Sequence, residues 1–289
     1  MSSDVTPIRQ QYLDIKKEFP NTILFFRLGD FYETFDADAE TVARELDIVL
    51  TSRNIAKDSR IPMAGVPHHA LENYLAKLIA KGYHVAVCEQ MGDEPIKGLF
   101  PRQVTRVVTP GTVIEPGLLA DSRNNYLAAV LSDGNRAGLA FVDITTGQFS
   151  AAQFESAEVL SLLRHELTRL SPAELLVPDG LDFSNGVLPP NALTPYKFDL
   201  AANRQLLLDH FGVETLAGFG LEHSPLAVRC AGAVLRYLKD TRPNALNLLV
   251  GLSTYSTGDF MVLDSATRRN LELTETIRGG QARGSLLGI

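Results

Sequence analysis

The stretch FFRLGDFYETF, residues 25–35, decides how the first half of this chain is organised. An apolar run rich in aromatic residues ends at Gly29-Asp30, a pair typical of turns, and an alternating segment follows it. Residues i and i+2 of an extended chain share a face, so Phe31 and Glu33 are predicted to point the same way. The sequence therefore predicts a strand, a tight turn, and a segment that presents an aromatic ring beside a carboxylate.

Two interpretations of this pair stay open from the residues alone. Aromatic side chains are mostly buried, which would make Phe31 part of a core and Glu33 part of a solvated surface. Alternatively, the segment after the turn presents both side chains to a binding partner. General residue statistics favour the first interpretation.

Helical and strand patterns alternate around this stretch. One apolar stripe follows Asp36 and Asp38, which suit a helix start, and a second stripe ends at Gly82. The stripes comprise Ala39, Val42, Ala43 and Leu46, and then Leu71, Tyr74, Leu75, Leu78 and Ile79. Strand-like runs lie at residues 22–28, 48–51, 83–88 and 104–108. The pattern predicts a small mixed sheet with helices packed on it.

A second unit is predicted beyond a turn at residues 109–112 and a linker-like stretch that follows it. Strand patterns at residues 126–131, 137–144 and 148–154 predict a meander, with Asp133-Gly134 as a hairpin turn. A helical stripe over residues 159–170 and a short strand at residues 174–177 come next. This βββαβ order predicts an α/β domain with an RNase H-like layout.

The last part of the chain is predicted to be helical. Ser224-Pro225 marks a helix start, and apolar residues recur along one side as far as Leu238. A further helix is expected to begin at Asp264 and to end at Gly279-Gly280. Only nine residues follow that pair, so we expect this helix to belong to a larger helical assembly of which the chain is a fragment.

The composition limits the class of protein. Hydrophobic residues make up 45% of the chain and charged residues 21%, as in ordinary soluble globular proteins. No apolar run reaches the roughly 18 residues that a membrane-spanning helix requires, and residues 1–9 lack the apolar core of a signal peptide. Cys88 and Cys230 are far apart and form no CxxC motif, so both are expected to be small buried residues in a reducing cytoplasm.

The net charge of −7 argues against a generic nucleic-acid binder, which is usually basic. Residues 1–112 hold 13 Lys and Arg against 15 Asp and Glu, and residues 113–289 hold 14 against 19. Any contact with DNA would therefore have to be local, or would depend on further chain.

The usual signatures of catalytic, metal and cofactor sites do not occur in this sequence. The six histidines form no HExxH motif, and the glycine pattern at residues 279–285 lacks the lysine of a P-loop. Gly218-Phe219-Gly220 lacks the third glycine of a dinucleotide-binding turn.

Asp143 keeps one enzymatic alternative open. It lies late in an apolar strand, where an RNase H-like nuclease would carry a metal-binding carboxylate, but a two-metal site needs convergent carboxylates that the neighbouring segments do not offer. We therefore expect Asp143 to be a strand-end residue that meets the turn at residues 145–147. A metal-dependent nuclease is the rival interpretation.

Several motifs in order resemble the MutS family of bacterial mismatch-recognition proteins. They are GDFYE at residues 29–33, LTSR at 50–53, IPMAGVPHHA at 61–70, CEQ at 88–90, VTPGT at 108–112 and DSATRRNLEL at 264–273. The resemblance spans the whole chain and implies an α/β fold. It implies a mixed-sheet mismatch-binding domain at residues 1–112, a linker at 113–124, an RNase H-like connector domain at 125–245, and the first helices of an all-α core or lever domain, truncated, at 246–289.

The resemblance also implies a function and a site. Members of the family recognise mismatched or unpaired bases in duplex DNA by inserting an aromatic wedge from the minor groove, which initiates DNA mismatch repair. Phe31 matches the wedge, and Glu33 matches the residue that hydrogen-bonds the displaced base. By the same resemblance, Arg53 and Arg102 are expected to contact the DNA backbone.

Two further DNA-binding residues are expected from the resemblance, each with a structural alternative. Arg106 is a candidate backbone contact, and Met63 a candidate for packing against the groove. A solvated cation and a core methionine are the corresponding alternatives.

The resemblance implies partners and cofactors for the full-length protein. That protein would be a homodimer, would bind a MutL-type matchmaker through its connector domain, and would carry a C-terminal ATPase that uses ATP and Mg. This chain is not expected to include the ATPase, so we expect no catalytic residue, no cofactor and no metal ion here, and no membrane contact. A pure protein-interaction module that docks through the acidic connector is the second rival interpretation.

Overall fold

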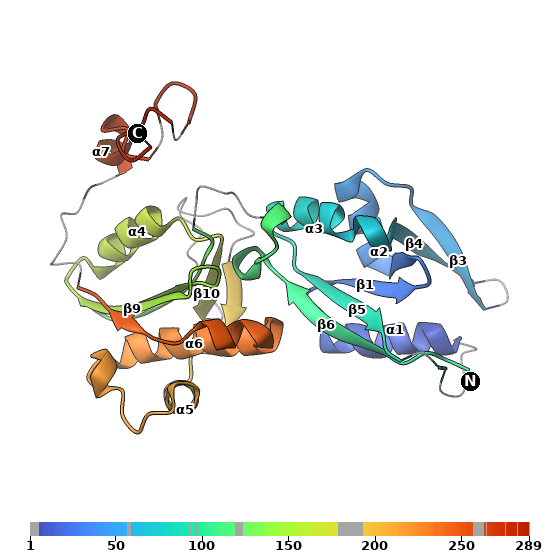
Figure 1. The fold of residues 1–289 in the computed structure, drawn as a ribbon, viewed down its shortest axis with the longest axis horizontal. Helices are drawn as coiled ribbons and strands as arrows, with labels where there is room; N and C mark the ends of the chain where they lie inside the picture. The colour runs from blue at the N-terminus through green and yellow to red at the C-terminus, as the bar shows by residue number, and fades with distance from the viewer. Residues whose placement is uncertain are drawn as a thin grey trace. The chain divides into compact units, whose positions relative to one another are not determined.

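The structure is a computed structural model that describes residues 6–56, 59–92, 94–95, 98–118, 124–178, 193–256, 263, 265–274, 276–281 and 283–288. The chain forms two compact units, which Figure 1 shows and which are described separately below. The first unit comprises residues 1–125 with 237–246, and the second comprises 126–236 with 247–289. No helix in the described part of the chain is both long enough and apolar enough to cross a membrane.

The first unit is built on a six-stranded mixed sheet in the order β3-β4-β2-β1-β5-β6. The strands are β1 (Ile23–Leu28), β2 (Phe31–Phe35), β3 (Thr51–Ala56), β4 (Ser59–Pro67), β5 (Val85–Gln90) and β6 (Arg102–Val108). β1 pairs with β5 in parallel, and the other neighbours are antiparallel. The predicted mixed sheet is confirmed.

One strand prediction in this unit is wrong. Residues 48–51 were expected to form a strand, but β3 begins only at Thr51. The preceding helix ends with Asp47 in the left-handed conformation at a φ of 55°, which redirects the chain before the strand starts. Val49 and Leu50 consequently lie outside the sheet and are exposed.

Helices cover both faces of this sheet, as Figure 1 shows. Helix α1 (Pro7–Glu18) packs on one face, where Tyr12 contacts a cluster that includes Phe26. Helices α2 (Asp36–Leu46) and α3 (Leu71–Ala80) pack on the other face through the two predicted apolar stripes. We refer to these two surfaces as the α1 face and the α2/α3 face.

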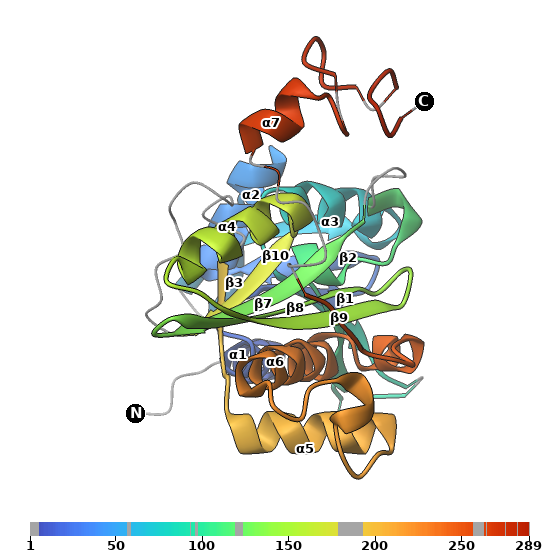
Figure 2. The same ribbon diagram turned by 90° about the vertical axis from the view of Figure 1, so that its left-hand side faces the viewer.

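The second unit has a six-stranded sheet in the order β11-β10-β7-β8-β9-β12. Its strands are β7 (Tyr126–Asp133), β8 (Arg136–Asp143), β9 (Gln148–Glu155), β10 (Glu174–Pro178), β11 (Leu193–Tyr196) and β12 (Ser253–Thr254). Helix α4 (Val159–Leu170) covers one face, and α6 (Pro225–Thr241) covers the other with α5 (Leu200–Phe211) behind it, as Figure 2 shows. The predicted βββαβ order is confirmed, whereas β11, α5 and β12 were not predicted.

Gly138 on β8 allows α6 to approach the sheet closely. A Cβ atom at this position would collide with the backbone of Leu226 and would lie 2.9 Å from the backbone nitrogen of Ala227. Because helix backbone cannot rotate away as a side chain can, a larger residue would force α6 off the sheet.

We therefore expect Gly138→Ala to lower the free energy of unfolding by ~1–3 kcal/mol, the usual cost of overpacking. Urea unfolding of the variant measures this change. Gly251→Ala is the matched control, because a Cβ there would meet no atom within 4 Å. A loss no greater than that of the control would contradict the close packing of α6 on β8.

The C-terminal helix is shorter than predicted. Asp264, its expected first residue, lies outside the described residues, and α7 spans only Ser265–Asn270. Glu272 then adopts a φ of 47°, which a helix cannot accommodate. Leu271 and Ile277 are exposed, and so short a helix is marginal without burial of its apolar side chains. The expectation that this helix continues to Gly279 is wrong.

Candidate nucleic-acid interface

The site begins with the hairpin that joins β1 to β2. Leu28 and Phe31 are paired across it, so Gly29 and Asp30 form a two-residue turn. Gly29 has a φ of +59°, a conformation that such a turn requires and that glycine adopts without strain. The turn therefore sets the position of Phe31 as the first residue of β2.

Phe31 is the exposed member of an otherwise buried set of aromatic residues. Phe31 is 47% exposed, whereas Phe25 and Phe26 on the neighbouring strand are completely buried. The next residue, Tyr32, is buried on the α2/α3 face, and its hydroxyl group donates a hydrogen bond to Glu89. Buried neighbours thus hold the backbone of β2 while the ring of Phe31 stays accessible.

Glu33 lies on the same face as Phe31 and forms an ion pair with Arg53. Arg53 is on β3, and β4 lies between β3 and β2, so the guanidinium group reaches across one strand. The Glu33 side chain is mostly buried, while that of Arg53 is 39% exposed. This ion pair therefore partly neutralises the carboxylate beside the exposed ring.

The surroundings of Glu33 oppose its ionisation. Burial raises the pKa of Glu33 above its ordinary value of 4.5, and the positive charge of Arg53 offsets only part of that rise. A carboxyl group removed from water favours its neutral form. The protonation of Glu33 is consequently sensitive both to pH and to the pairing of Arg53.

Met63 and Arg102 lie on the α1 face with Phe31 and Glu33. Met63 is the ladder partner of Phe35 and packs, partly buried, against the cluster beneath α1. Arg102 donates hydrogen bonds to the carbonyl oxygen of Arg27 at 2.7 Å and to Gln11 Oε1 at 3.0 Å. Its guanidinium carbon lies 5.0 Å from the ring centre of Phe26. Arg102 is thus held by protein contacts at the edge of the candidate site.

Arg106 lies on the opposite face. Arg102 pairs with Gln90, but an extra residue at Thr105 shifts the register, so that Arg106 pairs with Val87 of the α2/α3 face. A β-bulge of this kind reverses the side-chain alternation of the strand beyond it.

Two carboxylates hold Arg106 on the α2/α3 face. Its guanidinium nitrogens donate to Glu72 at 2.6 Å and to Glu115 at 3.0 Å. The structure therefore places five of the six sequence-predicted site residues on the α1 face, namely Phe31, Glu33, Arg53, Met63 and Arg102, and Arg106 on the other face. Arg53 and Arg102 lie on the two opposite edge strands of the sheet, β3 and β6.

Gly65 also lies on this surface and is not among the predicted site residues. Gly65 is the ladder partner of Glu33, and an ideal Cβ atom there would lie 3.9 Å from Cδ1 of Phe31. An isolated glycine inside an apolar strand is a recognised sign of a close approach by another group. That signal was present in the sequence between Ala64 and Val66.

Asp143, the residue of the nuclease alternative, is engaged by its own turn. Its Oδ1 accepts hydrogen bonds from the backbone nitrogen of Thr145 at 2.9 Å and from the Thr145 hydroxyl group at 2.6 Å. The predicted strand-end role is confirmed. Within the described ranges, no three His, Cys, Asp or Glu side chains converge as metal ligands would.

Both cysteines are buried with free thiol groups, as predicted. Burial raises the pKa of Cys88 to about 12, and burial also raises that of Cys230. A thiol that stays protonated at neutral pH is a poor nucleophile. Neither residue adds reactive chemistry to the site.

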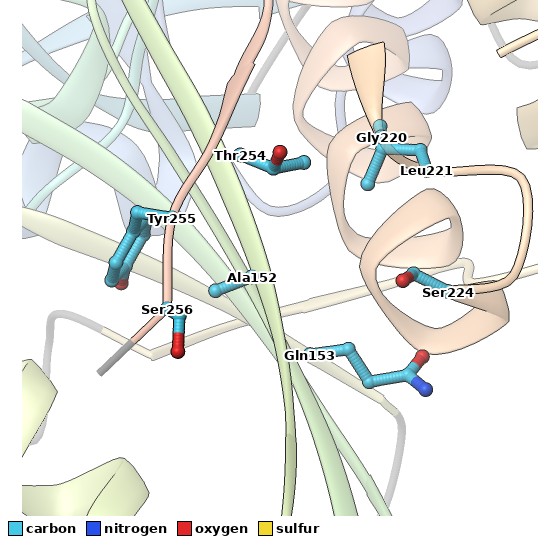
Figure 3. A pocket seen from close by; sticks show the side chains of 8 residues that line it. All are labelled: Ala152, Gln153, Gly220, Leu221, Ser224, Thr254, Tyr255 and Ser256. Carbon is cyan, nitrogen blue, oxygen red and sulfur yellow. The ribbon is translucent and has the colours of Figure 1, made fainter. Parts of the chain in front are cut away.

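The second unit contains a pocket of about 370 Å³, shown in Figure 3. It lies beside β9 and the start of α6, and it is lined by Ala152, Gln153, Gly220, Leu221, Ser224, Thr254, Tyr255 and Ser256. Gln153 Oε1 accepts a hydrogen bond from the backbone nitrogen of Leu226 at 2.9 Å, so its amide group stabilises the first turn of the helix. The lining carries no acidic or basic side chain, which does not suit a phosphate or metal ligand.

Comparison with known families assigns both units. The family described as MutS domain I matches residues 6–116, and the family described as MutS domain II matches residues 125–249. The chain is therefore a protein that contains MutS domain I followed by MutS domain II. The chain belongs to the MutS family.

Curated relatives support this assignment over nearly the whole chain. The DNA mismatch repair protein MutS of Symbiobacterium thermophilum is 49% identical over 294 residues, which cover 98% of this chain and 34% of that protein. The protein of the same name from Dehalococcoides mccartyi strain CBDB1 is 48% identical, over 99% of this chain and 33% of its own length. The corresponding protein of Thermosynechococcus vestitus is 46% identical, over 98% and 34%. The chain therefore spans about a third of the length of these relatives.

Proposed function

We propose that this chain recognises mismatched or unpaired bases in duplex DNA by inserting Phe31 from the minor groove, as the first step of DNA mismatch repair. The observation that carries the proposal is the exposed ring of Phe31 beside Glu33 on a strand held by buried neighbours. Membership of the MutS family and the names of the curated relatives support it.

The energies of insertion favour a faulty base step over a correct one. Unstacking a correct step costs a few kcal/mol, and less is needed where the pairing is already disturbed. Burying an exposed aromatic side chain contributes roughly 1.5–3 kcal/mol, and Phe31 can gain only part of this because about half of the residue is already covered. Insertion is therefore close to neutral at a weakened step and unfavourable at a matched one. The preference for mismatched over matched duplex then depends on how easily the base step deforms, and not on which bases it contains.

Glu33 supplies the second part of the discrimination. A carboxylate close to phosphate groups is repelled, so it penalises any duplex that offers it no hydrogen-bond partner. A base displaced by the wedge would provide that partner. Because the pKa of Glu33 is raised, protonation to a neutral donor is less costly here than at an exposed site.

Arg53 is the cation we assign to phosphate contact in this interface. It lies on the α1 face and is more than one-third exposed, so its guanidinium group can exchange Glu33 for a phosphate. The proposed roles of Arg102 and Met63 at the edge of the same face remain predictions. Arg106 as a DNA contact is also a prediction, and its two ion pairs with carboxylates favour a structural role instead.

For the whole protein we propose the partners and cofactors that the family implies. These are a homodimer around mismatched DNA, a MutL-type matchmaker on the connector domain, and an ATPase outside these 289 residues that uses ATP and Mg. The chain spans only about a third of the relatives' length, and we propose that the remainder contributes further contacts with DNA.

Arg53→Ala in the intact protein tests the assignment of the cation. We expect matched and mismatched duplexes to lose affinity by similar factors, and the slope of log affinity against log salt to fall by about one, as for one lost phosphate contact. Competition binding at several salt concentrations measures both quantities.

Arg44→Ala is the matched control for this variant, because it removes the same charge from α2 on the opposite face of the sheet. It should change neither the affinity nor the slope. If Arg53→Ala altered only the preference for mismatches and left the salt slope unchanged, Arg53 would be a base-reading residue and the assignment would be wrong.

A further inference from the structure

The middle row of the candidate site lacks one side chain. On the α1 face, β2 and β4 form three rows, which pair Phe31 with Pro67, Glu33 with Gly65, and Phe35 with Met63. Gly65 is the only one of these six residues without a side chain. The space above it therefore lies between the Phe31 ring and the stem of Glu33.

A side chain at this position would contact two residues of the proposed site. A Cβ atom on Gly65 would lie 3.5 Å from the carbonyl oxygen of Tyr32, 3.7 Å from Cγ of Glu33 and 3.9 Å from Cδ1 of Phe31. These are ordinary contact distances, so alanine would fit, but its methyl group would touch both functional side chains. Any larger residue would extend into the region between the ring and the carboxylate.

The backbone does not account for a glycine at this position. Gly65 is absent from the residues with positive φ, so its conformation is open to any amino acid. Glycine inside a strand also costs stability, because it packs nothing and loses more conformational freedom on folding. A branched residue such as valine would suit the strand better. Neither the backbone conformation nor the stability of the strand explains the glycine, so we look for its role in the open space beside Phe31 and Glu33.

We infer that Gly65 is a specificity-determining residue, which keeps open a slot for the unstacked nucleotide between the wedge and the carboxylate. The ligand is the base edge and deoxyribose of one nucleotide at the disturbed step, which approach the strand backbone directly. This inference rests on the proposed function and extends it to a third residue. Glycine is the residue that permits such an approach of a ligand to backbone.

The test compares Gly65→Val and Gly65→Ala, each made in the intact protein, with the unsubstituted intact protein, called the parent below. For Gly65→Val we expect mismatch affinity to fall by about tenfold or more, equivalent to ~1.4 kcal/mol, while matched-duplex affinity changes by less than about twofold. Gly65→Ala should retain most of the mismatch preference. Fluorescence of 2-aminopurine placed beside the mismatch should rise on binding of the parent and of Gly65→Ala, but not on binding of Gly65→Val.

Control variants distinguish an effect of filling the slot from an effect of damage to the fold. Gly117→Val adds the same side chain to an exposed glycine with no atom within 4 Å of its Cβ, and it should behave as the parent does. Thermal unfolding identifies a variant that fails to fold, and Gly65→Thr then provides a second branched side chain. A parent-like preference in a folded Gly65→Val or Gly65→Thr variant overturns the inference alone. A parent protein with no mismatch preference overturns the proposed function together with the inference.

Discussion

Phe31→Ala is expected to remove the preference of the intact protein for mismatched over matched duplex. The wedge is lost, and with it the apolar contact that offsets the cost of unstacking. We expect the ratio of the two affinities to fall by about tenfold or more, which corresponds to ~1.4 kcal/mol. Binding to matched duplex should hardly change, because phosphate contacts supply most of it. Competition binding with both duplexes measures the ratio.

The fold should tolerate this substitution, because Phe31 is half exposed and lies outside the two clusters that form the core of the first unit. Leu160→Ala is a matched control, since Leu160 on α4 is also 47% exposed and has no assigned role. It should leave the ratio of affinities unchanged. An unaltered ratio in Phe31→Ala would refute the role of the wedge.

Glu33→Gln is expected to weaken discrimination by the opposite route, by raising affinity for matched duplex. The amide group has nearly the shape of the carboxyl group but no charge, so the repulsion from phosphates disappears. Arg53 also loses its partner and becomes available to the DNA backbone. We expect matched-duplex affinity to increase by about tenfold. Glu40→Gln removes the same charge from an exposed position on α2 and should have no such effect.

The parent protein should approach the behaviour of Glu33→Gln as the pH falls. The pKa of Glu33 lies above 4.5, so protonation begins at a higher pH than for an exposed glutamate. Matched-duplex affinity of the parent should therefore increase as the pH is lowered toward this pKa, while that of Glu33→Gln stays flat over the same change. Parallel pH profiles for the two proteins would contradict the role of the Glu33 charge.

The raised pKa of Glu33 also makes the stability of the folded protein depend on pH. The folded state raises the pKa of Glu33, so it binds a proton more tightly than the unfolded chain does. The corresponding stability is fully present below the unfolded pKa and is lost as the pH rises through the folded one. Glu33→Gln should therefore gain stability relative to the parent as the pH increases across that interval.

The spacing of apolar residues in the sequence predicts a helix or strand correctly where that element buries a full apolar face. The stripe of α2 and the three strands β7, β8 and β9 are predicted from their patterns and form as expected. β12 has only two residues and exists because it pairs with Ser150 and Ala151, so no local pattern could indicate it. The helix expected from Asp264 to Gly279 ends at Asn270, and the large apolar residues Leu271 and Ile277 beyond it are exposed, so little apolar burial supports a longer helix.

The candidate site was predictable in its residues but not in its geometry. Alternation alone places Phe31 and Glu33 on one face, yet it cannot tell that Phe26 is buried and Phe31 exposed, since the cover comes from α1. Alternation would also place Arg102 and Arg106 on one face. The bulge in β6 separates them, and a bulge depends on the pairing with β5 rather than on the sequence of β6.

Photo-crosslinking from position 31 shows whether this residue enters the DNA at the mismatch. p-Benzoylphenylalanine replaces Phe31 in the intact protein, which is then irradiated on a duplex with one mismatch at a known position. If Phe31 is the wedge, crosslinks should be confined to the mismatched step and its immediate neighbours, and crosslinks on the matched duplex should not concentrate at any one step. Crosslinks spread evenly along the mismatched duplex, or absent from it while the protein is bound, would contradict insertion of residue 31.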